Sequence, residues 1–444
     1  MTEPEVDGVD EALALVGSRA PKQERHRATP WAEARSTAAR LGTARPTRTR
    51  RVALGQALGG VLAQPLTALT DLPSFDTSAM DGWAVAGPGP WRIHEGDSVL
   101  AGHAQTPPLP DGEAVRIATG ARVPTGATAV IRSEHSRTDA TGHLHARREV
   151  THGQDIRPRG QECRSGDRLL PAGTPVTPAV IGLAAAAGYD ELHTVVRPRV
   201  DVLVLGDELL AAGLPHDGLI RDALGPMLAP WLRALGADVG VTRRIGDDAD
   251  ALYAAVTESG ADVVITTGGT ASGPVDHVHP VLRKAGAELL VDGVKVRPGH
   301  PMLLARLTPA TYLVGLPGNP LAAVSGLLTL AEPLLRGLAG RRIPAPYRAA
   351  VRDEVHGHPH DTRLVPVAHE DGHATGNAAG RATGHAPGRG SGRVVPLHYN
   401  GPAMLRGIAA ADGLAVVPPG GARPGDVLEI LDLPWAATTE GCFT

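Results

Sequence analysis

Four short apolar runs alternate with four helical patterns between residues 200 and 338, and this alternation constrains the fold more than any other feature. The runs, each typical of a buried strand, span residues 200–205, 238–241, 262–266 and 311–314. The helical patterns span residues 222–235, 247–259, 275–285 and 320–338. Strands that alternate with helices predict a mostly parallel sheet with helices on both faces. We therefore expect a three-layer α/β domain in this part of the chain.

The rest of the chain predicts further domains, since 444 residues exceed what one hydrophobic core usually serves. Short β-like pieces separated by glycine and proline indicate a β-rich region before residue 160, whereas residues 27–60 favour a helix followed by basic connectors. The expected domains are a disordered extension at 1–26, a helical linker domain at 27–63 and 161–196, a β-rich domain at 64–160, the α/β domain at 197–339, and a C-terminal β domain at 340–437 with a disordered insertion near 370–392.

The composition favours a globular protein of a reducing cytoplasm. The formal net charge is −4, with only three lysines, so nucleic acid is not expected as a partner. The two cysteines, Cys163 and Cys442, are too few for a disulfide framework. We find no apolar run of 18 residues and no signal-peptide pattern, so no membrane is expected.

Three glycine-containing turns, at residues 266–273, 297–301 and 316–320, lie in or beside the predicted sheet. A turn between a strand and a helix offers backbone N–H groups to an anion, and three such turns suggest a ligand with several phosphate-like groups. A tight turn that binds nothing is the alternative for each motif. The residues expected to contact the ligand are Gly268, Gly269, Thr270, Ser272, Gly273, Pro298, Gly299, Pro317, Gly318 and Asn319.

Carboxylates follow the same predicted strands. Asp207 and Glu208 come after the first strand, Asp247 after the second, and Asp276 is expected just inside the helix after the third. The carboxyl ends of parallel strands share one edge of a sheet, so these side chains are predicted to converge. Mg²⁺ prefers oxygen ligands and often bridges carboxylates and phosphates. The alternative for Asp276 is a favourable interaction with the helix dipole.

A second polar cluster belongs to the β-rich region. Asp81 lies in a loop, 74–83, that has neither strand nor helix periodicity, and Arg157, Arg159 and Glu162 fall within six residues. Arginine suits forked recognition of an oxyanion. A charged surface loop is the alternative.

Taken in order, these segments resemble the molybdopterin molybdotransferase family, which includes the E domain of gephyrin. The matching stretches are 72–84, 117–127, 156–160, 205–209, 267–273, 297–301 and 316–320. The resemblance implies a molybdopterin-binding α/β domain, a β-rich lobe, a linker domain and a C-terminal β-barrel-like domain. It also implies a homodimer with the active site at the subunit interface.

The reaction implied by the resemblance is Mg²⁺-dependent release of AMP from adenylylated molybdopterin, with insertion of molybdate to form molybdenum cofactor. On this reading Asp207, Glu208 and Asp276 bind the metal. The residues expected to act in catalysis are Asp81, Arg157, Glu162, Asp247, Arg297 and His300. A paralogue that binds molybdopterin or a nucleotide without catalysis is the alternative, and an enzyme for another pterin or nucleotide is a third hypothesis.

The chain departs from the family pattern around the second turn. Arg297 and His300 stand where the family usually has lysines, and Glu162 replaces the usual aspartate. Lys295 is expected out of register, on the opposite strand face. Pro402 replaces a serine of the last domain. These changes remove cations and donors from the predicted molybdate side, whereas the glycine turns and the acids are retained.

Overall fold

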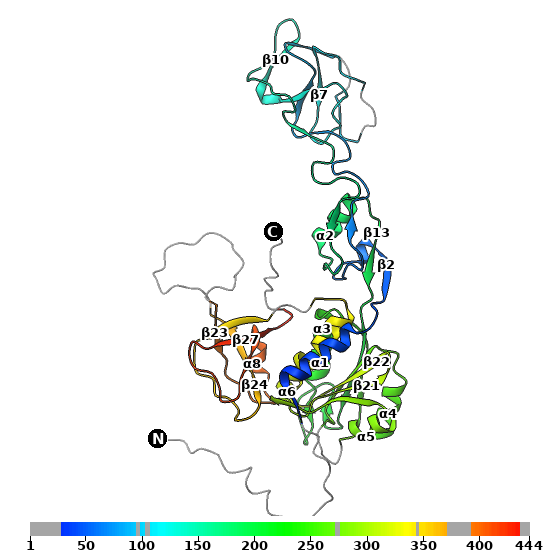
Figure 1. Cartoon of the computed structure of the whole chain (residues 1–444), viewed down its shortest axis with the longest axis vertical. Coiled ribbons are helices and arrows are strands. Elements are labelled where there is room, and N and C mark those ends of the chain that lie inside the picture. The colour runs from blue at the N-terminus through cyan, green and yellow to red at the C-terminus, as the bar shows by residue number, and fades with distance from the viewer. Residues whose placement is uncertain are drawn as a thin grey trace, which may run out of the picture.

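The computed structural model describes residues 28–94, 98–102, 107–270, 276–342, 346–370 and 392–435. The molecule is elongated, with a β-rich lobe at one end, a narrow neck, and an α/β domain beside a small β-barrel at the other end (Figure 1). The predicted extension at 1–26 lies outside the described residues, as does the predicted insertion at 370–392 apart from its two end residues.

A six-stranded sheet of order β17-β14-β18-β22-β21-β19 forms the centre of the α/β domain. Its parallel strands are β14 (Arg199–Leu205), β17 (Asp238–Ile245), β18 (Val263–Thr267) and β22 (Thr311–Leu316). Two antiparallel strands that the sequence did not reveal, β21 (Leu303–Thr308) and β19 (Glu288–Asp292), complete one edge. The predicted parallel-dominated sheet is thus confirmed.

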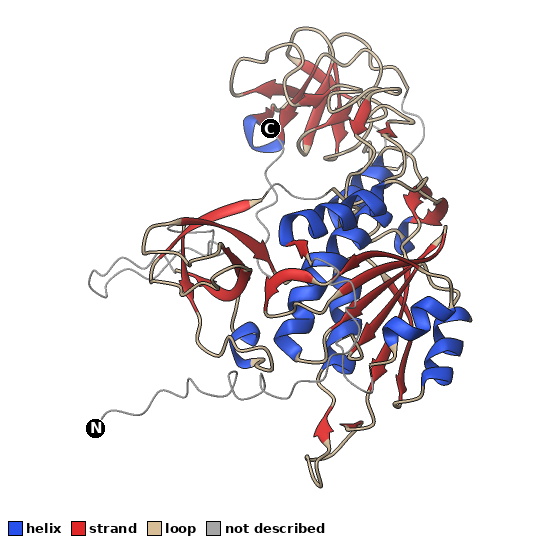
Figure 2. Cartoon of the chain, turned by 60° about the horizontal axis from the view of Figure 1, so that its bottom comes forward, coloured by secondary structure: helices blue, strands red, loops and turns tan. Residues whose placement is uncertain are grey.

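Helices cover both faces of this sheet, as predicted (Figure 2). They include α3 (Leu224–Ala234), α4 (Ala249–Thr257), α5 (Val278–Lys284), and a long segment made of α6 (Pro320–Gly326), a π-helical turn (Leu327–Ala331) and α7 (Glu332–Leu338). The segment Pro320–Leu338 is long and apolar enough to cross a membrane, but 83% of its apolar window is buried inside the protein. A helix that is hydrophobic all round is typical of a core helix.

Helix α1 (Trp31–Thr43) packs along α7 and not in the linker region where it was expected. The indole N–H of Trp31 donates to Oγ1 of Thr329 at 3.0 Å. The two helices meet at glycines, because a Cβ built on Gly42 would lie only 2.4 Å from the carbonyl oxygen of Leu334. The absence of a side chain at Gly42 therefore permits this close helix crossing.

The neck is built where the chain leaves and re-enters the α/β domain. β2 (Thr49–Ala53) pairs with β13 (Glu191–Val195), β3 (Leu66–Thr67) pairs with β12 (Arg168–Leu170), and α2 (Pro178–Ala186) packs beside them. A strand at 49–53 replaces the basic connector expected there. Of its residues only Val52 is buried, so the segment carries no apolar alternation.

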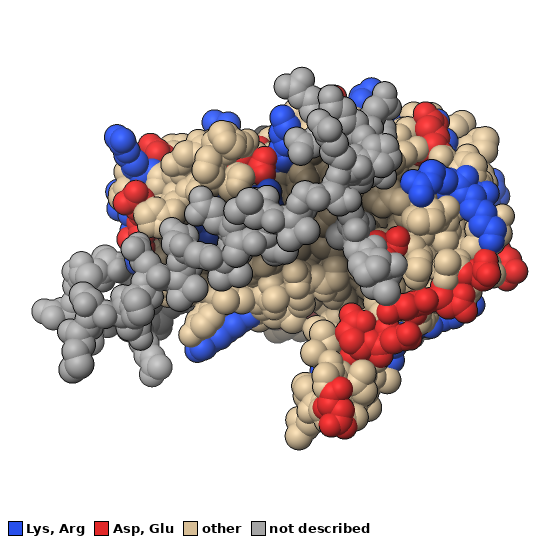
Figure 3. Space-filling view, turned by 90° about the horizontal axis from the view of Figure 1, so that it is seen from below, with Lys and Arg blue, Asp and Glu red and all other residues tan. Residues whose placement is uncertain are grey.

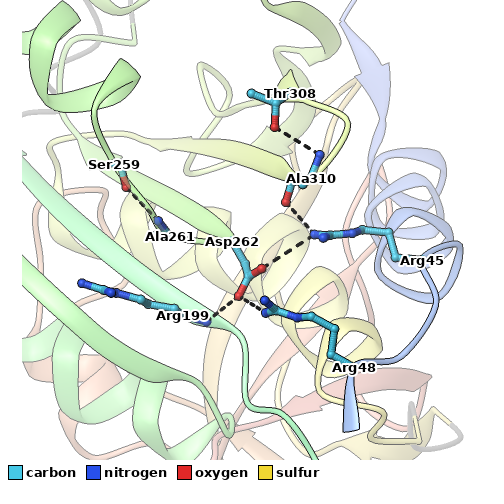
Figure 4. A network of polar contacts seen from close by, with 8 residues as sticks. All are labelled: Arg45, Arg48, Arg199, Ser259, Ala261, Asp262, Thr308 and Ala310. Atoms are coloured by element: carbon cyan, nitrogen blue, oxygen red, sulfur yellow. Dashed lines mark hydrogen bonds and ion pairs between the residues drawn. The ribbon is translucent and has the colours of Figure 1, made fainter.

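Asp262 fixes the base of the neck to the sheet (Figure 4). Its Oδ2 accepts from Arg48 Nη2 at 2.6 Å and from the backbone N–H of Arg199 at 2.9 Å. Arg45 lies 3.8 Å from Oδ1 and donates to the carbonyl of Ala310. Asp262, which directly precedes β18, therefore holds both the segment that leaves the α/β domain and the segment that returns to it.

The lobe contains a second six-stranded sheet, of order β8-β5-β7-β6-β10-β9. Its strands are β5 (Gly82–Val85), β6 (Trp91–Ile93), β7 (Glu113–Ile117), β8 (Ala129–Arg132), β9 (Ser136–Thr138) and β10 (His143–Ala146). A separate pair, β4 (Thr77–Ser78) and β11 (Ile156–Arg157), lies between this sheet and the neck. The structure therefore confirms the predicted β-rich lobe.

The C-terminal region is a closed β-barrel, in agreement with the predicted barrel-like domain. Its strands are β23 (Tyr347–Val351), β24 (Thr362–His369), β25 (Arg393–Pro396), β26 (Gly413–Val417) and β27 (Val427–Asp432), with helix α8 (Arg406–Ala409). β24 pairs with both β25 and β26, which closes the barrel. β20 (Val294–Arg297) runs from the α/β domain onto β24, and β1 (Thr29–Pro30) pairs with β20.

Candidate functional site

The four parallel strands of the α/β domain end at one edge, and their loops touch there. The N–H of Gly206, after β14, donates to the carbonyl of Ile245 at the end of β17 at 3.1 Å. The N–H of Gly268, after β18, donates to the carbonyl of Leu316 at the end of β22 at 2.9 Å. The loops after β14 and β17, and those after β18 and β22, are therefore in contact at this edge.

The first and third turns lie against each other through their glycines. A Cβ on Gly318 would lie 3.6 Å from Cα of Gly268. Gly268 and Gly269 have φ of +82° and +65°, a region that favours glycine. Thr270 is buried, whereas Gly318 and Asn319 are exposed. Ser272 and Gly273 lie outside the described residues.

The carboxylates after β14 and β17 lie in loops at this same edge. Asp207, Glu208 and Asp247 are exposed, and Oδ1 of Asp207 would lie 2.3 Å from a Cβ on Gly246, so this carboxylate rests on the loop after β17. Asp276 is not inside a helix as expected, because α5 begins at Val278. Among the described residues, no group of three or more histidine, cysteine or acidic side chains is arranged to hold a metal ion.

The second turn packs against the helix that follows the third. Gly299 is buried with φ of +114°, and a Cβ there would lie 3.1 Å from the carbonyl oxygen of Ala322 in α6. Half-buried His300 directs Nδ1 to the carbonyl of Val294 at 2.8 Å, back along the strand that precedes the turn. The second turn therefore contacts α6, and through it lies next to the third turn; Gly299 and Pro317 are buried, and Pro298 is half-buried.

Lys295 lies on the same face of β20 as Arg297, so its expected opposite placement was wrong. Val294 and Val296 are buried on one face, and Lys295 and Arg297 alternate with them on the other. The Nε of Arg297 donates to Oδ2 of Asp361 at 3.0 Å. This contact links the second turn to the start of β24, and no pattern in the sequence predicts it.

The barrel brings another arginine beside Arg297. Arg363 is the register partner of Arg297 in the parallel pairing of β20 with β24. Its Nη1 donates to the carbonyl of His356 at 2.6 Å and its Nη2 to Oδ1 of Asn400 at 3.0 Å. Sequence reasoning missed Arg363, because only the pairing of two distant strands places it here.

The start of α6 is partly capped by the barrel. The N–H groups of Leu321 and Ala322 both donate to the carbonyl of Pro402, at 2.9 and 3.2 Å. These two N–H groups are therefore not available to an anion at the third turn. The N–H groups of Gly318 and Asn319 are the ones that remain for a ligand there, since Pro320 has none.

The second polar cluster is assembled at the base of the lobe. Oδ1 of Asp81 accepts from the backbone N–H of Thr119 at 2.7 Å, and this hydrogen bond lowers the pKa of Asp81. Arg157 pairs in register with Thr77, and the N–H of Glu162 donates to the carbonyl of Leu72. The motifs at 72–84, 117–127 and 156–160 therefore contact one another.

The two groups of predicted site residues lie apart within one chain. Figure 1 shows the lobe and the α/β domain at opposite ends of the molecule, with the neck between them. Seen from the α/β end, acidic side chains gather in a band on one side of the surface (Figure 3). A single chain therefore does not bring Asp81, Arg157 and Glu162 to the glycine turns.

Sequence comparison gives matches along nearly the whole chain. Residues 9–188 match the family described as the MoeA N-terminal region (domain I and II), residues 201–337 a probable molybdopterin binding domain, and residues 348–433 the MoeA C-terminal region (domain IV). The molybdopterin molybdenumtransferase of Staphylococcus aureus is 33% identical over 300 residues, covering 65% of this chain and 71% of that protein. Molybdopterin molybdenumtransferase 2 of Mycobacterium tuberculosis is 38% identical over 314 residues, covering 67% of this chain and 76% of that protein.

Solved structures share the same fold. A molybdopterin biosynthesis protein from Pyrococcus horikoshii aligns with a TM-score of 0.72 at 23% identity, over 92% of this chain and 99% of that one. A second structure from that organism aligns with a TM-score of 0.68 at 21% identity, over 91% of this chain and all of that one. At this level of identity the likeness concerns the arrangement of the domains.

Proposed function

The chain belongs to the molybdopterin molybdenumtransferase family, an enzyme family of molybdenum cofactor biosynthesis, and we propose how its residues serve that reaction. The protein inserts molybdate into adenylylated molybdopterin and releases AMP in an Mg²⁺-dependent step. The observation that carries this proposal is the meeting of the first and third glycine turns with the acidic loops at the carboxyl edge of one parallel sheet, with the second turn packed on α6. Such an edge is where open α/β sheets bind nucleotides.

The glycine turns hold the pyrophosphate of the substrate. The exposed N–H groups of Gly318 and Asn319 lie beside Gly268, whose positive φ lets the backbone approach an anion closely. Thr270, expected from the sequence as a hydroxyl donor, is buried beside this turn, and Ser272 lies outside the described residues. Binding across two adjacent turns orients the scissile phosphoanhydride toward the acids after β14 and β17.

The carboxylates fit the oxygen chemistry of Mg²⁺. Asp207 and Glu208 are exposed at the sheet edge, and Mg²⁺ usually takes one or two carboxylates together with phosphate oxygens, so a preformed cage is unnecessary. The ion would be held by Asp207, Glu208 and Asp276. When bound, it would neutralise negative charge on the phosphate oxygens. Asp247, exposed on the neighbouring loop, orients the attacking water.

Molybdate binds on the barrel side, near Arg297 and His300, and the lobe of a second subunit completes the site. Asp81, Arg157 and Glu162 lie too far away within their own chain, which supports a homodimer in which one subunit's lobe covers the other's glycine turns. Arg157 is exposed and can meet an oxyanion. The reaction would take place in the cytoplasm.

A specific observation favours the binding paralogue as the second candidate. Arg297 is engaged by Asp361, and Pro402 occupies two donors of α6, so the molybdate side offers fewer open donors than the sequence alone implied. Such a paralogue would bind the nucleotide and release no AMP in response to molybdate.

Purified protein with adenylylated molybdopterin, Mg²⁺ and molybdate separates the two candidates by AMP release. The enzyme should turn over, and Asp207→Asn should reduce the rate by at least about a hundredfold, a typical loss for a group that stabilises charge in the transition state. Asp238→Asn is the matched control, because Asp238 is exposed at the opposite end of β17. Tight nucleotide binding without molybdate-dependent AMP release would instead identify the paralogue.

A further inference from the structure

We infer that Asp361 is a positioning residue that aims the guanidinium of Arg297 at the tetrahedral oxyanion substrate, an inference that rests on the proposed function. Asp361 precedes β24 of the barrel, whereas Arg297 ends β20 and begins the second glycine turn. The ion pair between them therefore joins the barrel to the turn on which molybdate is placed.

The contact uses only one edge of the guanidinium. Nε of Arg297 donates to Oδ2 of Asp361 at 3.0 Å, and neither Nη group has an acceptor within the described part of the chain. Half of the Arg297 side chain is exposed. The two Nη groups consequently remain as a planar fork, the geometry that arginine uses to bind an oxyanion with two parallel hydrogen bonds.

The carboxylate is itself held in place. Only 12% of the Asp361 side chain is exposed, and its backbone N–H donates to Nδ1 of His358 at 3.0 Å. The next residue, Thr362, is paired in register with Val296. A carboxylate fixed between a tight turn and a strand ladder can restrict the rotation of Arg297 about its long side chain, which lowers the entropy lost when the anion binds.

Arginine and Asp361 form a matched pair that lysine would not form. An ammonium group is compact, so Asp361 would neutralise the charge of a lysine at position 297. Such a lysine would have no second set of N–H groups directed away from Asp361 to bind the anion. The adjacent cations do not substitute for this fork. Lys295 lies on the same face but is a point charge, and both Nη groups of Arg363 are engaged by His356 and Asn400.

The test compares Asp361→Asn, Arg297→Lys and the double variant in the full-length protein. The measurements are the Kd for molybdate by calorimetry with saturating AMP and Mg²⁺, and the KM for molybdate in AMP release. Each single variant should weaken molybdate binding about tenfold, the loss expected for one charge-assisted hydrogen bond. The double variant should return to within about threefold of the wild type, because a lysine without Asp361 is again an open cation.

Rescue in the double variant distinguishes positioning from a purely structural role, which would lower the melting temperature and leave the Kd unchanged. The inference is overturned if Asp361→Asn binds molybdate as well as or better than the wild type, if the double variant is no better than Arg297→Lys, or if the wild type binds no molybdate. A wild type that shows the expected Kd pattern but no turnover would refute the proposed function and leave the positioning role standing. Turnover by the wild type, with Kd and KM values for molybdate that are the same in the wild type and all variants, would support the proposed function and refute the positioning role of Asp361.

Discussion

The crossing of α1 and α7 predicts opposite outcomes for two glycine-to-alanine substitutions in helices. Replacing glycine by alanine in a helix interior usually stabilises a protein by about 0.5–1 kcal/mol. At Gly182 in α2 no atom lies within 4 Å of the added Cβ, so this gain should appear in full. At Gly42 the Cβ would lie 2.4 Å from the Leu334 carbonyl oxygen and 3.0 Å from Cα of Gly337, both backbone atoms that cannot rotate away.

Gly42→Ala must therefore push α1 from α7, at an overpacking cost of about 1–3 kcal/mol. After the gain in helix propensity is subtracted, we expect a net effect between about 0 and 2.5 kcal/mol of destabilisation, where Gly182→Ala stabilises. Urea unfolding measures the stability, and amide hydrogen exchange reports whether the loss is confined to α1. An equal stabilisation by Gly42→Ala and Gly182→Ala would refute the close crossing.

Two further predictions concern the anchor of the neck and the acid stability of the lobe. Asp262→Ala leaves the N–H of Arg199 and the guanidinium of Arg48 without their shared acceptor, so it should lower the free energy of unfolding in urea by about 3 kcal/mol. The control Asp250→Ala removes an exposed ion pair and should not change this free energy measurably. An equal effect of the two substitutions would contradict the anchoring role of Asp262. In the lobe, hydrogen bonds lower the pKa of Asp81, from Thr119, and of Asp139, from His145 and Thr141, below the ordinary value of 3.8. Their stabilisation is present above the ordinary pKa and is lost as the pH falls toward the lowered pKa values. The protection factors of lobe amides, which correct for the intrinsic exchange rate at each pH, should therefore fall below about pH 4. Protection factors unchanged down to about pH 2 would contradict this origin.

The α/β domain could be predicted because its strands and helices are buried and carry the signal in their own residues. Val263 to Ile265 are fully buried, and their uninterrupted apolar run is typical of a parallel strand covered on both faces. The antiparallel strands β19 and β21 were missed, because the turn at 297–301 interrupts the pattern and the chain passes through the barrel between them. β2 was missed for the related reason that most of its residues are exposed.

The candidate site was predictable where one segment supplies the feature and not where distant segments meet. Glycine turns and carboxylates after strands follow from local sequence and the common edge of a parallel sheet. The contact of Arg297 with Asp361 and the capping of α6 by Pro402 depend on how the barrel docks. No periodicity or spacing encodes such long-range contacts. The separation of Asp81 from the turns likewise depends on the neck.

The central claim is that the glycine turns of one subunit act with the lobe of another on adenylylated molybdopterin, and mixed dimers test it directly. Asp81→Ala impairs the lobe and Asp207→Ala impairs the sheet edge, so each variant alone should release almost no AMP. After unfolding and refolding of an equal mixture, about a quarter of the wild-type molybdate-dependent AMP release should return, because half of the dimers are mixed and each has one intact site. A mixture as inactive as its components would contradict a site shared between subunits.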